Sequence, residues 1–488
     1  MLNLNNTGGM TMGETKTEGQ LLNEKYMYSY SNAWEKSSED DKKAAFDFCE
    51  EYKKVLNAAK TEREFAAYAE NMALAKGFIR IEDALASGKK LKAGDKVYQL
   101  NRGKSVLLAV VGKNPIEQGV NVTGAHIDSP RLDLKQNPLY EDTDMALLKT
   151  HYYGGIKKYQ WVTVPMALHG VVIRKDGTKV QVSIGEDESD PVFTITDLLP
   201  HLAQDQMQKK ATEVIAGEGL NLLIGSIPFN DEKAKDKVKL NIMNLLNQKY
   251  GIIEEDFQSA EIEIVPAHKA KDVGIDRSMI GGYGQDDRVC AYPSLKAITE
   301  LDIPERTAVC ILSDKEEIGS TGNTGAESSI LEDFIAFVCS LAAPNYNDIV
   351  LRRCLRASKM LSADVNAAVD PNFDGVNDRK NSTFLGKGVM IQKYTGSRGK
   401  YGASDANAEF VGEVRRILND AKIIWQTGEL GKVDQGGGGT IALYAANIGM
   451  EVIDCGVPIL SMHSPFEIAS KIDIYMSYKA YKAFYAAV

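Results

Sequence analysis

From Gly103 to the end of the chain, short apolar runs that end in polar loops alternate with segments of helical periodicity. The strand-like runs include Val106–Val111, Val309–Leu312 and Glu451–Asp454, and the helix-like segments include Val289–Leu301, Ala406–Asn419 and Pro465–Ala487. Strands that alternate with helices along a chain are typical of a largely parallel sheet. The sequence therefore predicts an α/β fold with a mixed, largely parallel sheet flanked by helices.

Between about Pro138 and Ala267 the pattern is that of antiparallel strands. Residues 171–182 alternate apolar and polar side chains around an Asp-Gly pair, which is typical of a β-hairpin. The simplest interpretation is a β-rich domain, residues 138–274, inserted between the two parts of the α/β domain, residues 21–137 and 275–488. Residues 1–20 lack periodicity and are predicted to form a mobile N-terminal tail.

Composition excludes several classes of partner. With 57 Lys+Arg against 67 Asp+Glu, the net charge is −10, and no basic stripe offsets it, so nucleic-acid binding is disfavoured. No run of 18 apolar residues and no apolar leader segment is present, so we expect neither membrane insertion nor secretion. The 6 cysteines are scattered without a C-x-x-C pair, which favours reduced thiols and a cytoplasmic location.

Histidines and acidic residues follow several of the predicted strands. His126 begins an H-x-D pattern, in which the imidazole can bind a metal while a nearby carboxylate, here Asp128, holds its other nitrogen. Glu316 and Glu317 come directly after a buried strand. Adjacent glutamates usually mark a solvated turn, but such a pair can also divide into a metal ligand and a general base.

Three further positions have simple structural interpretations when each is taken alone. One carboxylate of the Asp286-Asp287 pair, at a predicted helix start, would be an N-cap, and Asp364 would be a turn residue. His463 precedes Ser464-Pro465-Phe466-Glu467, which has the pattern of a capping box. Jointly, five such segments favour one site, because open α/β sheets bind ligands outside the carboxyl ends of their strands. Two histidines with several carboxylates suit Zn²⁺ or a similar divalent ion, and a shared carboxylate suits two ions about 3.5–4 Å apart.

The same segments, in this order, resemble the aspartyl aminopeptidase and aminopeptidase I family of dinuclear zinc exopeptidases. The segments that carry the resemblance are residues 123–132, 285–288, 314–320, 362–364 and 461–464, and the likeness extends from about residue 80 to the C-terminus. It implies a metalloaminopeptidase that removes the N-terminal residue from peptides with a free N-terminus.

The resemblance also implies a role for each residue of the site. The metal ligands would be His126 and Asp364 on one ion, Glu317 and His463 on the other, and Asp286 bridging both. Asp128 would hold His126, and Glu316 would be the general base that deprotonates the water between the ions. The two ions per subunit would be Zn²⁺, with Co²⁺ or Mn²⁺ as alternatives.

For the assembly, the resemblance implies a homo-oligomer, a tetrahedral dodecamer, with the inserted domain as the dimerisation domain. In the family, a histidine of this domain reaches the neighbouring subunit's active site and stabilises the oxyanion. His201, in residues 193–202, is the candidate for that role, and His169 is its rival.

Substrate preference depends on two stretches. Lys393, Arg398 and Lys400 gather in a glycine-interrupted loop that could pair with a substrate carboxylate or simply be solvated. Acid-specific members carry histidines where this chain has Ala367 and Asp370. Acidic N-terminal residues are therefore the first expectation, with neutral or apolar ones as an alternative. The rival activity is that of a zinc amidohydrolase or deacylase on the same type of metal site.

Overall fold

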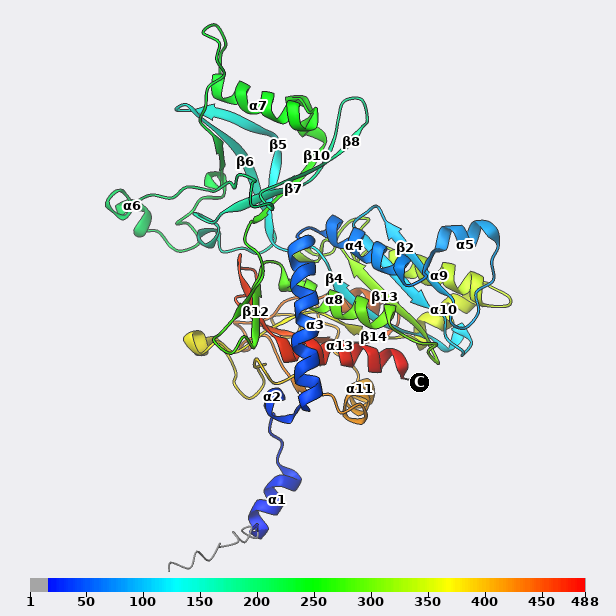
Figure 1. Cartoon of the computed structure of the whole chain (residues 1–488). Helices are drawn as coiled ribbons and strands as arrows, with labels where there is room; N and C mark the ends of the chain where they lie inside the picture. The colour runs from blue at the N-terminus through cyan, green and yellow to red at the C-terminus, as the bar shows by residue number, and fades with distance from the viewer. Residues whose placement is uncertain (1–15, 488) are drawn as a thin grey trace, which may run out of the picture.

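A computed structural model describes residues 16–487 (Figure 1). Its largest sheet has nine strands in the order β1-β2-β3-β13-β4-β14-β18-β16-β17. These strands are β1 (Ile79–Arg80), β2 (Lys96–Asn101), β3 (Ser105–Val110), β4 (Val120–His126), β13 (Thr307–Ser313), β14 (Lys359–Ser362), β16 (Val389–Gln392), β17 (Trp425–Thr427) and β18 (Glu451–Gly456). The central strands β13, β4, β14 and β18 run parallel, whereas β3 and β16 pair with them antiparallel. The predicted mixed, largely parallel sheet is confirmed.

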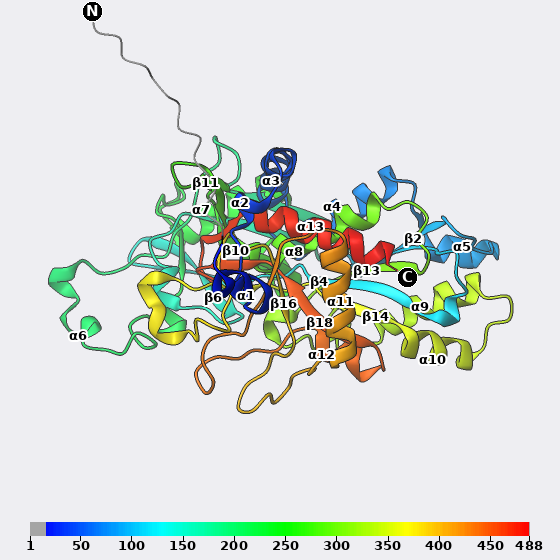
Figure 2. The ribbon, with the colours of Figure 1, turned by 90° about the horizontal axis from the view of Figure 1, so that it is seen from below.

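Helices cover both faces of this sheet. One layer contains α3 (Glu39–Ala58), α4 (Glu62–Ala75), α8 (Gln285–Thr299), α11 (Ala408–Asp420) and α13 (Lys471–Ala486). The other contains α5 (Ile81–Ser87), α9 (Ile330–Ala342), α10 (Asp348–Ala357) and α12 (Ala442–Asn447). In Figure 2, α3 and α13 of the first layer lie above the strands, and α9, α10 and α12 of the second lie below them. Along β3, Val106 and Leu108 pack into the first layer and Leu107 into the second, which explains why this strand is a continuous apolar run.

The segment predicted as an inserted domain, residues 138–274, contributes to a second sheet, whose strand β5 begins earlier, at Arg131. This sheet has six strands in the order β8-β7-β10-β5-β6-β9, with every neighbouring pair antiparallel. Its strands are β5 (Arg131–Asp142), β6 (Met145–Tyr153), β7 (Met166–Ile173), β8 (Lys179–Ile184), β9 (Leu222–Gly225) and β10 (Ala260–Pro266). Helix α7 (Lys237–Tyr250) packs on this sheet, which lies above the α/β domain in Figure 1. The predicted hairpin over residues 171–182 is confirmed as the β7–β8 pair.

A small third sheet has the order β11-β12-β20-β19-β15. Its strands are β11 (Lys271–Val273), β12 (Met279–Gly282), β15 (Asn366–Ala367), β19 (Pro458–Leu460) and β20 (Glu467–Ser470). Strand β20 corrects one prediction, because the last helix begins at Lys471 and not at Pro465. The predicted capping box at residues 464–467 is therefore wrong, since Glu467 lies in a strand and its carboxylate binds other backbone groups.

The described N-terminal part contains short helices joined by non-helical segments. Residues 1–15 of the predicted tail lie outside the described residues, and α1 (Glu18–Tyr26) begins within its last residues, capped by Thr17. Helix α1 projects away from the body of the molecule, and α2 (Ala33–Lys36) connects it to α3 (Figure 1). Over residues 16–487, no helix is both long and apolar enough to cross a membrane.

Candidate metal centre

Three neighbouring parallel strands end at the same edge of the large sheet, and each is followed by a residue of the candidate site. His126 is the last residue of β4, Glu316 and Glu317 lie just beyond β13, and Asp364 lies just beyond β14. The pairing of β4 with both β13 and β14 places these ends side by side. The carboxyl-end rule for open α/β sheets thus describes where these side chains gather.

Asp286 lies between two histidines. Its Oδ1 atom is 3.1 Å from Nε2 of His126, and its Oδ2 atom is 3.2 Å from Nε2 of His463. Asp364 Oδ1 lies 3.8 Å from the same nitrogen of His126, and Glu317 Oε2 lies 3.5 Å from Nε2 of His463. Two groups of candidate ligands result, one on each side, and they share Asp286.

Each histidine is held through its second ring nitrogen. Nδ1 of His126 faces the carbonyl oxygen of Asp128 at 3.1 Å and its carboxylate at 3.2 Å, and Nδ1 of His463 faces the carbonyl oxygen of Gly155 at 2.8 Å. Because these oxygens can only accept hydrogen bonds, Nδ1 is the donor in both rings. Nε2 of both rings is therefore the atom directed toward the shared carboxylate, as metal-binding histidines require.

The centre concentrates negative charge away from water. Burial, and then the charge of Asp286, raises the pKa of Glu317 well above its usual value, and burial likewise raises the pKa of Asp364. Burial alone would raise the pKa of Asp286 too, but its contacts with the imidazole rings of His126 and His463 lower it. Among the described residues, the buried Oε1 atom of Glu317 has no hydrogen-bond partner. A cluster of buried carboxylates with an unpartnered oxygen fits divalent cations, and nitrogen and oxygen donors without sulfur suit Zn²⁺.

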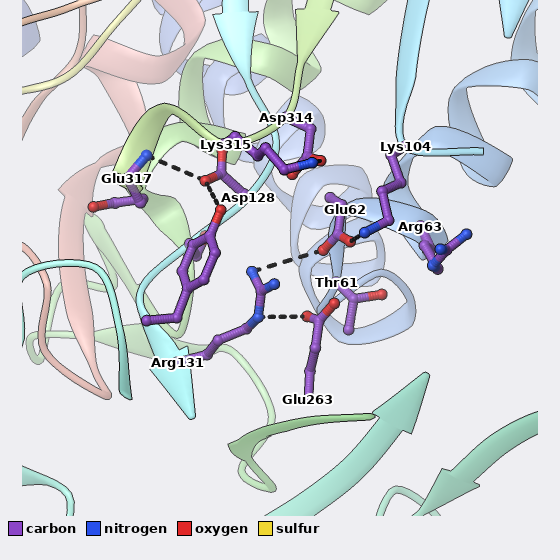
Figure 3. Close-up of polar contacts among 12 residues, drawn as sticks. Thr61, Glu62, Arg63, Lys104, Asp128, Arg131, Glu263, Asp314, Lys315 and Glu317 are labelled. Carbon is purple, nitrogen blue, oxygen red and sulfur yellow. Dashed lines mark hydrogen bonds and ion pairs between the residues drawn. The ribbon is translucent and has the colours of Figure 1, made fainter. Parts of the chain in front are cut away.

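Glu316 has a different environment from its neighbour. Its carboxylate lies 4.0 Å from Nε2 of His126 and lines a cavity of about 370 Å³, which all the candidate ligands except His126 also line. Burial, with the charge of Asp128 adding to it, raises the pKa of Glu316 to about 7. The backbone N–H groups of Glu316 and Glu317 donate to the two carboxylate oxygens of Asp128, at 3.1 and 3.2 Å. Asp128 therefore anchors both the candidate base and a candidate ligand. Figure 3 shows its contact with Glu317.

The helix start at Asp286 differs from the simple structural interpretation. The N-cap residue of α8 is Gly284, and no side chain caps the helix. The interpretation of Asp286 or Asp287 as an N-cap is therefore wrong. Asp287 instead accepts the backbone N–H of His126 at 3.3 Å. The pair thus faces the end of β4, with one carboxylate toward the histidine rings and the other toward the backbone.

The two candidate oxyanion histidines lie in different surroundings. His201 is exposed on a short turn, Pro200–Leu202, and does not line the cavity of its own chain. His169 is 3% exposed and lies between Glu64 and Glu186, at 2.7 and 3.0 Å. A buried ion pair within one chain does not suit a group that must reach another subunit.

The cationic loop lies next to the cavity of the metal centre without lining it. Lys393 and Lys400 both pair with Asp405, at 2.7 and 2.9 Å. Arg398 and Lys400 line an adjacent cavity of about 230 Å³, and the two cavities share Gln392 and three other lining residues.

Sequence reasoning missed three residues that hold the centre. The Glu467 carboxylate accepts the backbone N–H of His463 at 2.8 Å and that of Asp286 at 3.1 Å, and burial raises its pKa to about 8. Tyr153 and Gly155, at the end of β6, contact Asp128 and His463. The Gly-Gly pair directly after an alternating strand was the available signal, because it marks a close backbone approach.

Comparison with known proteins finds relatives that match this chain over most of its length. The sequence profile of the family described as aminopeptidase I zinc metalloprotease (M18) matches residues 55–485. The chain is 56% identical over 455 residues to the probable M18 family aminopeptidase 1 of Clostridium acetobutylicum, covering 93% of this chain and 98% of that relative.

Solved structures show the same fold. The crystal structure of the M18 family aminopeptidase from Thermotoga maritima matches with a TM-score of 0.90 and 45% identity, covering 94% of this chain and 100% of that one. The dodecamer structure of yeast mApe1 matches with a TM-score of 0.73 at 19% identity, covering 90% of this chain and 96% of that one.

Proposed function

Because this chain belongs to the aminopeptidase I zinc metalloprotease family (M18), and is thus a zinc metalloaminopeptidase, we propose that it works with two metal ions bound by five side chains. His126 and Asp364 would hold one ion, Glu317 and His463 the other, and Asp286 both. The observation that carries this proposal is the shared carboxylate of Asp286, whose two oxygens face the two histidines. Zn²⁺ is the proposed ion, and Co²⁺ and Mn²⁺ are alternatives that the same nitrogen and oxygen donors accept.

In the proposed reaction, Glu316 moves the protons. When bound, two ions lower the pKa of water and polarise the carbonyl of the scissile peptide bond. The Glu316 carboxylate takes the proton of the attacking water and returns it to the departing amine. Asp128 keeps Glu316 in place through the backbone and keeps His126 oriented through its ring. The chain thereby supplies both a proton carrier and a rigid frame around the attacked carbonyl.

For the assembly, we expect a homo-oligomer, a tetrahedral dodecamer, in which His201 serves the neighbouring subunit. The exposure of His201 and its absence from the lining of its own cavity support this assignment over His169, which is buried in an ion pair. The dodecamer of yeast mApe1, which shares this fold, is consistent with the proposal. A cytoplasmic location stays a prediction, which the 6 free, buried cysteines favour.

For the substrate, we expect peptides with an acidic first residue. Arg398 and Lys400 line the cavity that adjoins the metal centre, where a cation can offset the burial of a carboxylate. Neutral or apolar first residues stay the alternative, because Asp370 uses its carboxylate to cap the turn Pro371–Val376 and offers no histidine.

The test is hydrolysis of a series of X-Ala dipeptides, with metal analysis of the same purified sample. We expect two ions per chain, hydrolysis of the free dipeptides and no hydrolysis of their N-acetylated forms. Cleavage of the acetylated forms alone would instead support the deacylase. One ion per chain at full activity would contradict the dinuclear centre.

A further inference from the structure

The end of strand β6 brings the inserted domain into contact with the metal centre. The Tyr153 hydroxyl donates to Oδ2 of Asp128 at 2.8 Å, and the carbonyl oxygen of Gly155 accepts from Nδ1 of His463 at 2.8 Å. Between them, Gly154 has a φ of +76°, and a Cβ at this position would lie 3.3 Å from both Cβ and Oε2 of Glu317. Three consecutive residues of one domain thus contact three different parts of a site built by the other.

Tyr153 completes the hydrogen bonding of a carboxylate that water does not reach. Asp128 is fully buried, and its Oδ2 atom accepts only from Tyr153 and the backbone of Glu317 among the described residues. Burial and the Asp128 carboxylate keep the pKa of Tyr153 far above its usual value, so the hydroxyl stays a donor. Without this donor, Oδ2 of the buried Asp128 would keep only the backbone N–H of Glu317, which weakens the anchor of the turn that carries Glu316 and Glu317.

The tyrosine ring is itself fixed at the junction of the two domains. Arg131 is its cross-strand partner on β5, and the guanidinium lies 3.8 Å from the ring centroid. The same guanidinium is buried between Glu62 of α4 and Glu263 of β10, at 3.8 and 3.2 Å (Figure 3). The position of the hydroxyl therefore depends on how the inserted domain docks on the α/β domain.

Gly155 orients the second histidine of the centre, His463. Its carbonyl oxygen can only accept, so it keeps the proton of His463 on Nδ1 and leaves Nε2 for the centre. A side chain at position 155 would approach Nδ1 of His463 to 3.3 Å, which explains why a glycine stands here.

We propose that residues 153–155 are a positioning segment through which the inserted domain sets the geometry of the metal centre. Tyr153 orients Asp128, and through it Glu316 and Glu317, while Gly155 orients His463. The proposal rests on the function proposed above, and it adds that metal affinity and turnover depend on a domain that supplies no metal ligand.

The test compares Tyr153→Phe with Tyr152→Phe in the full-length protein. Tyr152 is the adjacent residue and is 42% exposed, so it controls for the loss of a hydroxyl on this strand. Phenylalanine at 153 keeps the ring against Arg131, so we expect the midpoint of thermal unfolding to match that of Tyr152→Phe. Zn²⁺ affinity, measured by competition with a chelator, should fall in Tyr153→Phe by up to about 10- to 100-fold, the loss that is typical when the partner of a ligand histidine, here Asp128, is itself removed.

Kinetics separate positioning from metal loss. At saturating Zn²⁺, kcat of Tyr153→Phe should remain about tenfold or more below that of Tyr152→Phe with KM unchanged, because Glu316 stays misoriented after the ions return. Equal Zn²⁺ affinity and equal kcat in the two variants would overturn the proposal. A wild-type protein that binds no metal would instead overturn the proposed function, so the two failures are distinguishable.

A second pair of variants tests the segment independently. Gly154→Ala and Gly177→Ala both place a side chain at a positive φ, +76° and +83°, but position 177 has no neighbouring atom within 4 Å. We expect both to lose some stability and only Gly154→Ala to lose Zn²⁺ affinity, because its Cβ contacts Glu317. Equal affinities in the two alanine variants would contradict the proposal.

Discussion

The His169 imidazole on strand β7 lies 2.7 Å from the Glu64 carboxylate on helix α4, so a buried ion pair joins the inserted domain to the α/β domain. The other ring nitrogen lies 3.0 Å from Glu186. Burial alone would lower the pKa of His169, but the two carboxylates raise it to about 9. The junction that holds Tyr153 against Asp128 is therefore closed by a protonated histidine.

This histidine makes domain docking sensitive to pH. Its pKa rises from 6.5 to about 9 on folding, so its contribution is complete below pH 6.5 and is lost as the pH rises through about 9. A pKa shift of this size corresponds to a contribution of about 3 kcal/mol to the free energy of unfolding. We expect His169→Gln to lower the free energy of unfolding by about that amount at pH 6 and by much less at pH 9.5, measured with urea. The same loss at both pH values would contradict the assignment, and the exposed His151, as His151→Gln, is the control.

The two adjacent glutamates should respond differently to the same substitution. Glu316→Gln removes a proton carrier and should lower kcat by about 10²–10⁴-fold while both ions stay bound. Glu317→Gln removes a ligand and should lose metal. Metal analysis and kinetics on the same samples check this prediction. If the two variants bound the same amount of metal and were equally active, the roles assigned to Glu316 and Glu317 would be refuted.

His201 should act across a subunit interface. We expect light scattering to give a mass far above the 53.5 kDa of one chain. Mixing inactive His201→Ala with inactive Glu316→Gln should restore part of the activity, because one site of a mixed pair then receives both intact groups. Full activity of a 53.5 kDa species would exclude the exchange.

Arg398 should select for acidic substrates. Lys393 and Lys400 share Asp405, whereas no ion pair of Arg398 is found among the described residues, so Arg398 is the more available cation. Arg398→Ala should lower kcat/KM for Glu-Ala by about tenfold or more and leave Leu-Ala unchanged, with a smaller effect for Lys400→Ala. Arg416→Ala, on the exposed face of α11, controls for net charge. Wild-type preference for Leu-Ala would count against an acidic pocket and direct attention to Ala367 and Asp370.

The sequence predicted best those features that depend on a single helix or strand. The apolar run at residues 106–111 and the periodic segment at 406–419 predicted β3 and α11 closely, because burial of a strand or a helix face leaves its period in the sequence. At residues 464–467 the same reasoning failed. The capping-box pattern was present, but Glu467 pairs in β20 and binds the backbone of His463 and Asp286 instead.

By itself, the sequence determined the α/β class, the antiparallel hairpin at residues 171–182 and which strand ends carry acids and histidines, because each of these follows from the pattern of short segments. Only the tertiary structure decided which of these ends meet. Strand β4 lies between β13 and β14, and Gly155 contacts His463 from the other domain, 308 residues away in sequence. The hydrophobic periodicity of a segment shows which of its faces is buried, but it does not show which partner covers that face. The hydrogen bonds that orient the metal centre therefore emerge only once the domains have packed.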